Sequence, residues 1–279
     1  MEQVIGSAPE HICDLFQGSA AGCVEMVNSR GIYLRVGHSC VLLCSSRFGT
    51  VPNGAALEQW ERLPSLIEPG QPFHTENGII SFPAASWQMC LQRIPKDTQV
   101  RLPDATSLNT GIRLLKENAK QTGLSSLVFP LFAEQAPPMN PYCHMALPYV
   151  QTLLRSLQKE NAAGIEGAVS GLLGLGPGLT PSGDDLLSGL LYGLRHSPAR
   201  GLAASKMLSN AICARAGERT NAVSADYLLA LAKDAPFDRM AQAWTDPGAG
   251  AMGLMEIGSN SGGEMLLGLL CAGSLCIEA

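Results

Sequence analysis

Short apolar stretches separated by turns occupy residues 23–82 of the chain, and this pattern is typical of β-strands. β-Branched and apolar side chains dominate each stretch, and turns containing glycine or asparagine separate them at the spacing of hairpins. The predicted strands are residues 23–27, 32–36, 40–45 and 79–82. We therefore expect a β-rich unit that forms a barrel or a curved sheet.

After Pro103 the apolar positions recur every three or four residues, which predicts amphipathic helices. In residues 108–122, Ile112 and Leu115 share one face, and Gly123 follows as a helix stop. Further helices are predicted at residues 149–157, 165–173, 184–195, 202–216, 222–233 and 264–276.

The chain has 279 residues, of which 46% are hydrophobic, so it can bury a substantial core. We predict an α+β fold, with a β-rich domain at residues 1–105 and a mainly α-helical domain at residues 106–279. Only 15% of the residues are charged and the net charge is −5, which argues against a nucleic-acid partner. No apolar stretch reaches the roughly 18 residues of a membrane span. The first residues also lack the basic start of a signal peptide, so we expect a cytoplasmic protein.

The nine cysteines form no CxxC pair, and Cys40-x3-Cys44 and Cys271-x4-Cys276 lie in apolar surroundings. We therefore expect reduced thiols that act as small hydrophobic side chains, and we expect no metal site and no cofactor. The chain also lacks the GxSxG and HExxH motifs. His38, His74, His144 and His196 have no recognisable catalytic partners in sequence.

The most unusual stretch is residues 174–185, with the sequence GLGPGLTPSGDD, directly before a predicted helix. Glycine lets a main chain approach a ligand closely, and the start of a helix attracts an anion by about 0.3–2 kcal/mol. Hydroxyls can donate to phosphate or carboxylate oxygens, and carboxylates can bind an amide, accept a proton or hold a divalent cation. The candidate ligand-binding residues here are Gly176, Gly178, Thr180, Ser182 and Gly183, and the candidate catalytic acids are Asp184 and Asp185.

A second loop repeats the first, because residues 182–191 align without gaps on residues 261–270. A serine, a glycine, an acid, a second glycine and a Leu-Leu pair coincide. We expect the two helices to lie side by side, packed through Gly189 and Gly268, with their N-termini at one place. The candidate ligand-binding residues of this loop are Ser259, Asn260, Ser261, Gly262 and Glu264.

Helix capping is the alternative explanation of both loops. Ser182 with Asp185, and Ser261 with Glu264, each have the spacing of a capping box, which stabilises a helix start without any ligand. Capping leaves Asp184 unexplained. On this interpretation Asp185 serves the helix, Asp184 serves the ligand, and replacing Asp184 by Asn costs little stability.

Residues 218–224 form a third candidate segment, in which Thr220 and Ser224 are four apart and would share a helical face. Arg219 could pair with a phosphate or carboxylate in a bidentate way. The alternative is a Thr220 that caps a helix and an Arg219 exposed to solvent. The loops are not a P-loop, because no lysine follows Gly183, so a nucleoside triphosphate is not the expected ligand.

These motifs resemble those of a bacterial family first defined as a domain of unknown function, which includes the AllH-type subunit of oxamate carbamoyltransferase. The resemblance lies in the sequence GPGLTPSxDD followed by LxG, in residues 220–228, and in the Gly258-x-x-Ser261-Gly262 loop. It spans most of the C-terminal half. The N-terminal part is similar only in kind, through its short strands and residues 48–57.

The resemblance implies a subunit that acts with an FdrA-type protein and a third subunit in the anaerobic breakdown of allantoin, a purine catabolite. That enzyme moves a carbamoyl group between carbamoyl phosphate and oxamate, both small anions. Such transfer needs donors around the phosphate and the developing oxyanion, and a group that accepts a proton. Two other hypotheses stay open: a non-catalytic subunit that binds or senses a small anion, and a metal-dependent enzyme that uses Asp184, Asp185 and Glu264.

Overall fold

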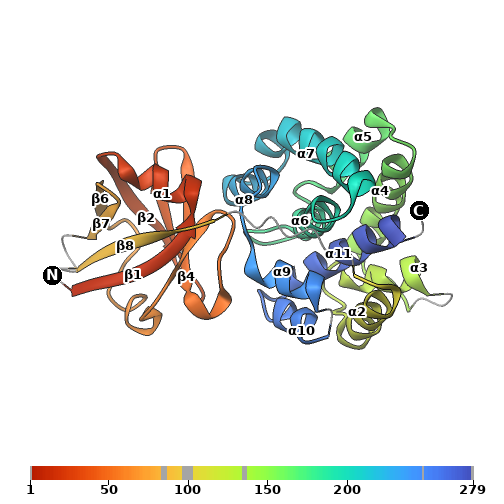
Figure 1. Ribbon diagram of the computed structural model, residues 1–279, viewed down its shortest axis with the longest axis horizontal. Coiled ribbons are helices and arrows are strands. Elements are labelled where there is room, and N and C mark those ends of the chain that lie inside the picture. Colours follow the sequence, from red (N-terminus) through yellow and green to blue (C-terminus); the bar gives the residue numbers. More distant parts are fainter. Residues whose placement is uncertain (1, 83–86, 96–102, 134–136, 247, 278–279) are drawn as a thin grey trace. The chain divides into compact units, whose positions relative to one another are not determined.

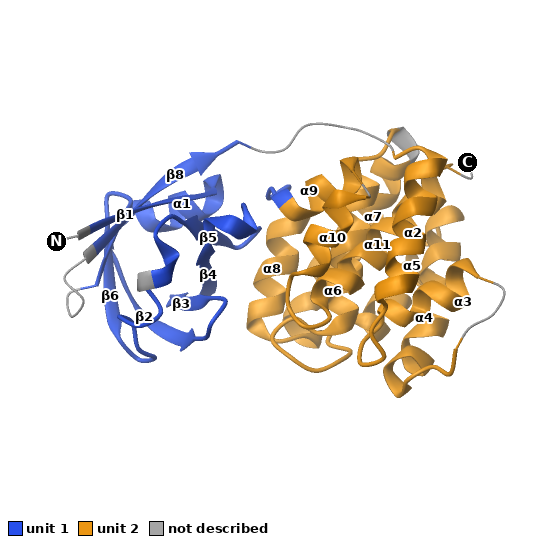
Figure 2. Ribbon diagram, turned by 90° about the horizontal axis from the view of Figure 1, so that it is seen from below, with its two compact units in different colours: residues 1–97, 233–238 blue, residues 98–232, 239–279 orange. Residues whose placement is uncertain are grey.

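The structure is a computed structural model, and it describes residues 2–82, 87–95, 103–133, 137–246 and 248–277. The chain forms two compact units (Figure 2). One contains Met1–Asp97 and Lys233–Asp238, and the other contains Thr98–Ala232 and Arg239–Ala279. Strands make up the first unit and helices the second, so the predicted α+β class is confirmed (Figure 1).

Over the described residues, the first unit is a closed barrel of eight strands. The strands are β1 (Glu2–Pro9), β2 (Ala20–Val27), β3 (Ile32–Val36), β4 (Ser39–Ser45), β5 (Gly54–Leu57), β6 (Pro72–Glu76), β7 (Ile79–Phe82) and β8 (Trp87–Ile94). Their order around the barrel is β1-β5-β4-β3-β2-β6-β7-β8, and the parallel pairing of β1 with β8 closes it. The four predicted strands correspond to β2, β3, β4 and β7, whereas β1, β5, β6 and β8 were not predicted.

Alternating side chains fill the barrel. In β3 the side chains of Ile32, Leu34 and Val36 are buried and those between them are only partly covered, which is the pattern of a strand with one face on a core. Helix α1 (Glu10–Gln17) adds Phe16 to the same core, where Phe73 and Phe82 pack with their ring centroids 5.5 Å apart. Short 3-10 turns, η1 (Ser46–Phe48) and η2 (Trp60–Arg62), connect the strands.

The second unit is helical (Figure 1). Its elements are α2 (Ala105–Asn118), η4 (Ser125–Leu127), α3 (Val128–Phe132), α4 (Pro141–Gln158), α5 (Ala162–Leu172), α6 (Ser182–Arg195), α7 (Ala199–Arg219), α8 (Ala222–Ala232), α9 (Asp238–Thr245), α10 (Ala249–Met255) and α11 (Ser261–Ile277). The seven predicted helices are present as α2, α4, α5, α6, α7, α8 and α11. The short helices α3, α9 and α10 were not predicted.

Helices α6 and α11 form the centre of this unit, and their contact is the largest between any two described elements. Every residue of α6 from Ser182 to Leu194 is buried, so this helix is covered on all sides. A Cβ atom on Gly189 would overlap the main-chain oxygen of Met265, and one on Gly268 would overlap that of Leu186. The predicted packing of the two helices through these glycines is thus confirmed.

All nine cysteines lie in the described ranges, none of them is in a disulfide, and five are buried. Burial raises the pKa of Cys44 and of Cys271 to about 12, so both stay protonated and behave as small apolar side chains. Within the described residues, none of the helices is both long enough and apolar enough to cross a membrane.

Candidate functional site

The two glycine-serine-acid loops, residues 173–181 and 256–260, differ in length but close with the same kind of main-chain bond. The amide of Gly183 donates to the carbonyl of Leu175 at 2.9 Å, and the amide of Gly262 donates to the carbonyl of Ile257 at 3.0 Å. These glycine amides bond within the protein, so the hydroxyls become the more accessible donors for a ligand. Each loop joins two helices. Helices α5 and α6 form the first helix-loop-helix unit, and α10 and α11 form the second.

The contacts between these two units are reciprocal. Gly189 packs on Met265 while Gly268 packs on Leu186, and Met265 and Leu186 are themselves equivalent positions in the sequence alignment. Reciprocal contacts of this kind are the mark of a two-fold relationship. The helices run parallel, because their N-terminal loops touch, so both helix starts face the same place.

The loops meet at a pair of hydroxyls. Thr180 Oγ1 and Ser261 Oγ are 3.2 Å apart and both residues are partly exposed. Beneath them, Ser182 lies beside the carboxyl of Glu264 and lowers its pKa, while Ser261 does the same for Asp185. Each serine thus serves the acid of the other unit, and the prediction that the two loops converge is confirmed.

Three glycines allow the main chain of the loops to adopt positive φ angles. Gly176, Gly178 and Gly258 have φ values of 110°, 105° and 62°, a range that side chains disfavour. A Cβ on Gly176 would lie 2.9 Å from the main-chain nitrogen of Ser182, and one on Gly258 would lie 2.9 Å from the hydroxyl of Ser261. These glycines are thus needed for the loops to fold back over their own serines, independently of any ligand.

The capping-box interpretation is wrong for both loops. Ser182 is the first residue of α6 rather than its cap, and the preceding Pro181 makes no side-chain cap. Neither carboxylate oxygen of Asp185 accepts a hydrogen bond from any described residue. Glu264 Oε1 accepts instead from the amide of Leu124 at 2.8 Å, far away in sequence. The acids therefore have roles outside their own helix starts.

Asp184 has the structural role that sequence reasoning gave to its neighbour. It is fully buried, and its Oδ1 accepts from the amide of Gly174 at 2.8 Å. Its Oδ2 accepts from the hydroxyl of Ser224 at 2.6 Å and from that of Thr220. Burial raises the pKa of Asp184, and the hydrogen bonds from these groups oppose that rise. Asp184 thus fastens α6 to the start of α8.

The third predicted segment joins the site through this acid. Thr220 ends α7 in an extended conformation, while Ser224 lies in α8, so the two do not share a helix. Asn221, not Thr220, caps α8, because its Oδ1 accepts from the amide of Ser224 at 3.1 Å. Arg219, at the end of α7, is exposed, and no bond to the other candidate residues is seen.

Asp185 is the unsatisfied member of the site. Burial raises its pKa well above the ordinary value, the charge of Glu264 raises it further, and the nearby Ser261 and Thr180 lower it by less. Burial also raises the pKa of Glu264, and the amide of Leu124 and the charge of Lys120 act against this rise. Two carboxyls that share a buried space titrate as a coupled pair rather than singly.

Several residues around the loops were missed by sequence reasoning. Tyr227 of α8 is buried, and its pKa is raised by burial and by the charge of Asp185, so the ring lies close to that acid. The Lys120 ammonium donates to the carbonyl of Ser259, and Thr122 Oγ1 donates to Asn260 Oδ1 at 3.0 Å. No motif in residues 118–127 marks this segment, because its position depends on tertiary packing.

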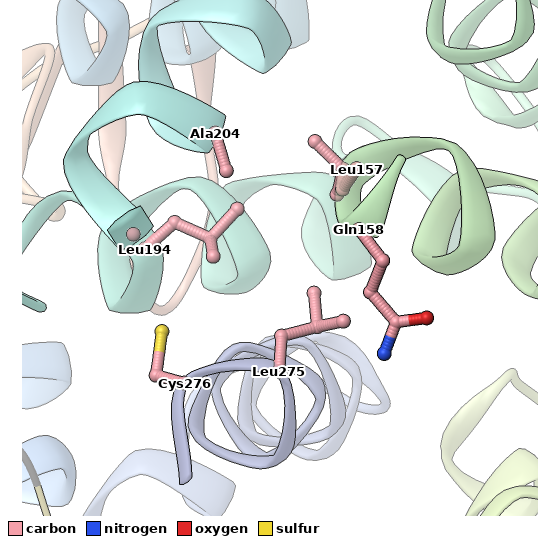
Figure 3. Close-up of a pocket in the computed structure, with 7 residues that line it drawn as sticks. Leu157, Gln158, Leu194, Ala204, Leu275 and Cys276 are labelled. Atoms are coloured by element: carbon pink, nitrogen blue, oxygen red, sulfur yellow. The ribbon is translucent and has the colours of Figure 1, made fainter. Parts of the chain in front are cut away.

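Among the hollows that border the helix pair, two lie at its opposite ends. One, of about 170 Å³, lies beside the second loop and has Lys120, Ser125, Asn260 and Gly263 among its lining residues. The other lies at the far ends of α6 and α11, lined mainly by apolar side chains that include Leu194 and Leu275 (Figure 3). Its volume of about 20 Å³ suits one water rather than a substrate.

Among the described residues, no three His, Cys, Asp or Glu side chains converge in a way suited to a metal ion. Asp184, Asp185 and Glu264 do not form such a set, since Asp184 faces Gly174, Thr220 and Ser224 instead. The geometry therefore gives the metal-dependent hypothesis no ligand cluster.

Fold and site together define an α+β protein whose helical unit holds two matched loops around buried acids. Residues 172–273 match the family model described as Oxamate carbamoyltransferase subunit AllH. This confirms the resemblance for the region that runs from the end of α5 to α11, which includes both loops and the segment around Thr220. The comparisons with curated proteins and with solved structures give no match.

Proposed function

We propose that this chain is a cytoplasmic subunit of a carbamoyltransferase that handles carbamoyl phosphate and a small carboxylate amide such as oxamate. Its partners in this proposal are an FdrA-type subunit and a third subunit, and its role is in the anaerobic breakdown of allantoin. The observation that carries the proposal is the match to the AllH family over residues 172–273, the same region in which the two loops converge.

The chemistry of the loops supports this assignment. Thr180 and Ser261 present hydroxyls at the surface, and two helix starts lie behind them, an arrangement that favours a small anion. Carbamoyl transfer also requires a proton acceptor, and buried carboxyls with raised pKa values are stronger bases than exposed ones. Asp185 and Glu264 lie directly behind the hydroxyls.

The direct test is a carbamoyl-transfer assay. The chain is purified alone and together with its two proposed partners, and each sample is supplied with carbamoyl phosphate and oxamate. We expect phosphate release that depends on oxamate, and formation of N-carbamoyl oxamate, from the complete complex. Absence of both products from the complete complex would overturn the proposal.

A second candidate is a subunit that binds the anion without taking part in the chemistry. The full burial of Asp184 and Asp185 favours it, because neither carboxyl reaches the surface. Calorimetric titration of the isolated chain with carbamoyl phosphate separates the two. Binding by this chain, combined with unchanged turnover when Ser261 and Thr180 are replaced by Ala and Val in the complex, would support the second candidate.

A further inference from the structure

The carboxyl of Asp185 lies in the buried interior, where polar groups normally form hydrogen bonds, but it forms none with the described residues. It is fully buried, and neither of its carboxylate oxygens accepts a hydrogen bond from any described residue. Buried polar groups are almost always hydrogen-bonded, because a buried group without a hydrogen bond destabilises the fold. The equivalent acid of the other unit, Glu264, does receive a bond from the Leu124 amide. The fold thus keeps one unfavourable carboxyl where a closely similar one is satisfied.

The groups around Asp185 favour a carboxyl that takes up and releases a proton over one that is held by a fixed hydrogen-bond partner. The titratable and charged groups that face the pair are Asp184 on α6, Tyr227 on α8, and, near Glu264, Lys120 and the Cys143 thiol of α4. Lys120 donates to the Ser259 carbonyl, and Asp184 is held by three donors. The remaining acids, Asp185 and Glu264, lie close enough across the helix pair for the charge of Glu264 to raise the pKa of Asp185.

Two hydroxyls, of Ser261 and Thr180, lie between Asp185 and the surface, and a small movement of Ser261 toward Asp185 would complete a hydrogen-bonded path, since no such bond is formed in this structure. Ser261 lies beside Asp185 and is 3.2 Å from Thr180, and both hydroxyl residues are partly exposed. A hydroxyl can accept a proton on one side while it gives one away on the other. Protons can therefore pass between the buried carboxyls and a molecule held at the surface without the carboxyls being exposed.

We propose that Asp185 and Glu264 hold one proton between them and move protons for the carbamoyl transfer through Ser261 and Thr180. This inference rests on the proposed function. The acceptor's amide nitrogen forms a bond to the carbamoyl carbon as the bond from that carbon to the phosphate oxygen breaks. The ionised carboxyl takes up the N–H proton, and the protonated one gives its proton to the departing phosphate. One proton enters and one leaves, so the pair ends in its starting state.

The two acids are positioning residues for protons, because they act through the hydroxyls. The test measures kcat and KM of the assembled complex against pH, using the wild-type chain, Asp185→Asn and Glu264→Gln. Glu264→Gln keeps an oxygen for the Leu124 amide, so it provides a second route if Asp185→Asn folds poorly. Glu256→Gln changes an exposed acid beside the second loop and is the matched control.

We expect each pair variant to lower kcat by about 100-fold or more, the usual contribution of proton transfer. KM for carbamoyl phosphate should change less than about threefold, and the pH dependence of kcat should flatten. The control should retain the wild-type profile. An active wild-type complex whose two pair variants keep both kcat and pH profile overturns this inference but leaves the proposed function intact. A wild-type complex that transfers no carbamoyl group overturns both.

Discussion

The two helix-loop-helix units of the helical domain share one backbone but differ in how their acids are used. In both, a glycine amide bonds back to the preceding loop and a glycine on the helix packs against the partner helix. In the second unit the acid, Glu264, is bonded to the Leu124 amide, and the position before it is a glycine. In the first unit the equivalent position is Asp184, and both of its carboxylate oxygens accept hydrogen bonds. Neither carboxylate oxygen of the acid Asp185 accepts one from the described residues.

This difference separates what the repeat needs for folding from what it does not. Features present in both units, such as the loop glycines and Gly189 with Gly268, are explained by close packing. The unpartnered carboxyl of Asp185 is present in one unit only, and packing does not explain it. When a residue departs from the usual rules of folding without a gain in stability, we expect it to have a functional role.

The largest expected effect comes from breaking the contact between the two units. Gly189→Val should destabilise the helical unit by more than about 3 kcal/mol, because its side chain would overlap the main chain of Met265. Denaturant unfolding checks this, with Trp244 fluorescence as the probe of the helical unit after Trp60 and Trp87 are replaced by Phe.

Gly167→Ala is the control for this prediction, because a Cβ at that exposed helical position meets no atom within 4 Å. It should stabilise α5 by about 0.5–1 kcal/mol. If Gly189→Val unfolds at the same denaturant concentration as the parent, the close contact between α6 and α11 is not needed for stability.

The next effect separates the two neighbouring acids. Asp184→Ala should cost about 2–3 kcal/mol, because the Gly174 amide and the hydroxyls of Thr220 and Ser224 lose their common acceptor. Asp184→Asn keeps one oxygen and should cost less, but it is no longer expected to be neutral. Denaturant unfolding measures both variants. Parent-like stability for Asp184→Ala would show that these bonds contribute little.

The exchange of roles between Asp184 and Asp185 shows where sequence reasoning stops. The repeat, the convergence of the loops and the packing glycines were predictable, because they follow from local spacing. Adjacent residues on a helix point in directions about 100° apart. Which of them meets Thr220 and Ser224 depends on how α7 and α8 pack, and local sequence does not encode that packing.

The same limit applies to the fold. β3 was predicted because its alternation is clear, whereas β5, with the sequence GAAL, is buried at every position and carries no alternation. Helix α10 is short and contains Gly250 and Gly253, and glycine is a weak helix former, so its helix signal is weak. Lys120 reaches the Ser259 carbonyl and Leu124 reaches Glu264 from a segment about 140 residues earlier in the chain, so no motif could connect them.

A smaller and more specific effect concerns pH. Burial holds the folded pKa of Asp185 above its ordinary value near 4, so the folded state keeps this proton more tightly than the unfolded state does. Its contribution to stability is therefore present below about pH 4 and is lost as pH rises through the folded pKa. The slope is at most about 1.4 kcal/mol per pH unit.

Asp185→Asn should remove this slope, so the unfolding free energies of the parent and the variant should converge or cross as pH rises from 4.5 to 8. Unfolding curves followed by Trp244 at several pH values give the difference directly. Asp184 is present in both proteins, so most of its contribution cancels, whereas Glu264 titrates together with Asp185 and the difference therefore reports on the pair. Parallel pH profiles would mean that Asp185 titrates normally in the folded protein.

The smallest effect compares the equivalent acids of the two units directly. Glu264→Ala leaves the buried Leu124 amide without an acceptor, whereas Asp185→Ala removes a carboxyl that has no partner. We expect Glu264→Ala to cost about 1 kcal/mol more than Asp185→Ala, since an orphaned buried donor is penalised and the loss of an unbonded carboxyl is not. Glu264→Ala also removes one methylene more than Asp185→Ala, and this adds about 0.8 kcal/mol to the difference expected from the orphaned amide. Denaturant unfolding at neutral pH measures both variants. An equal cost would indicate that Asp185 is bonded in solution, and the asymmetry between the two units would then lie only in Asp184.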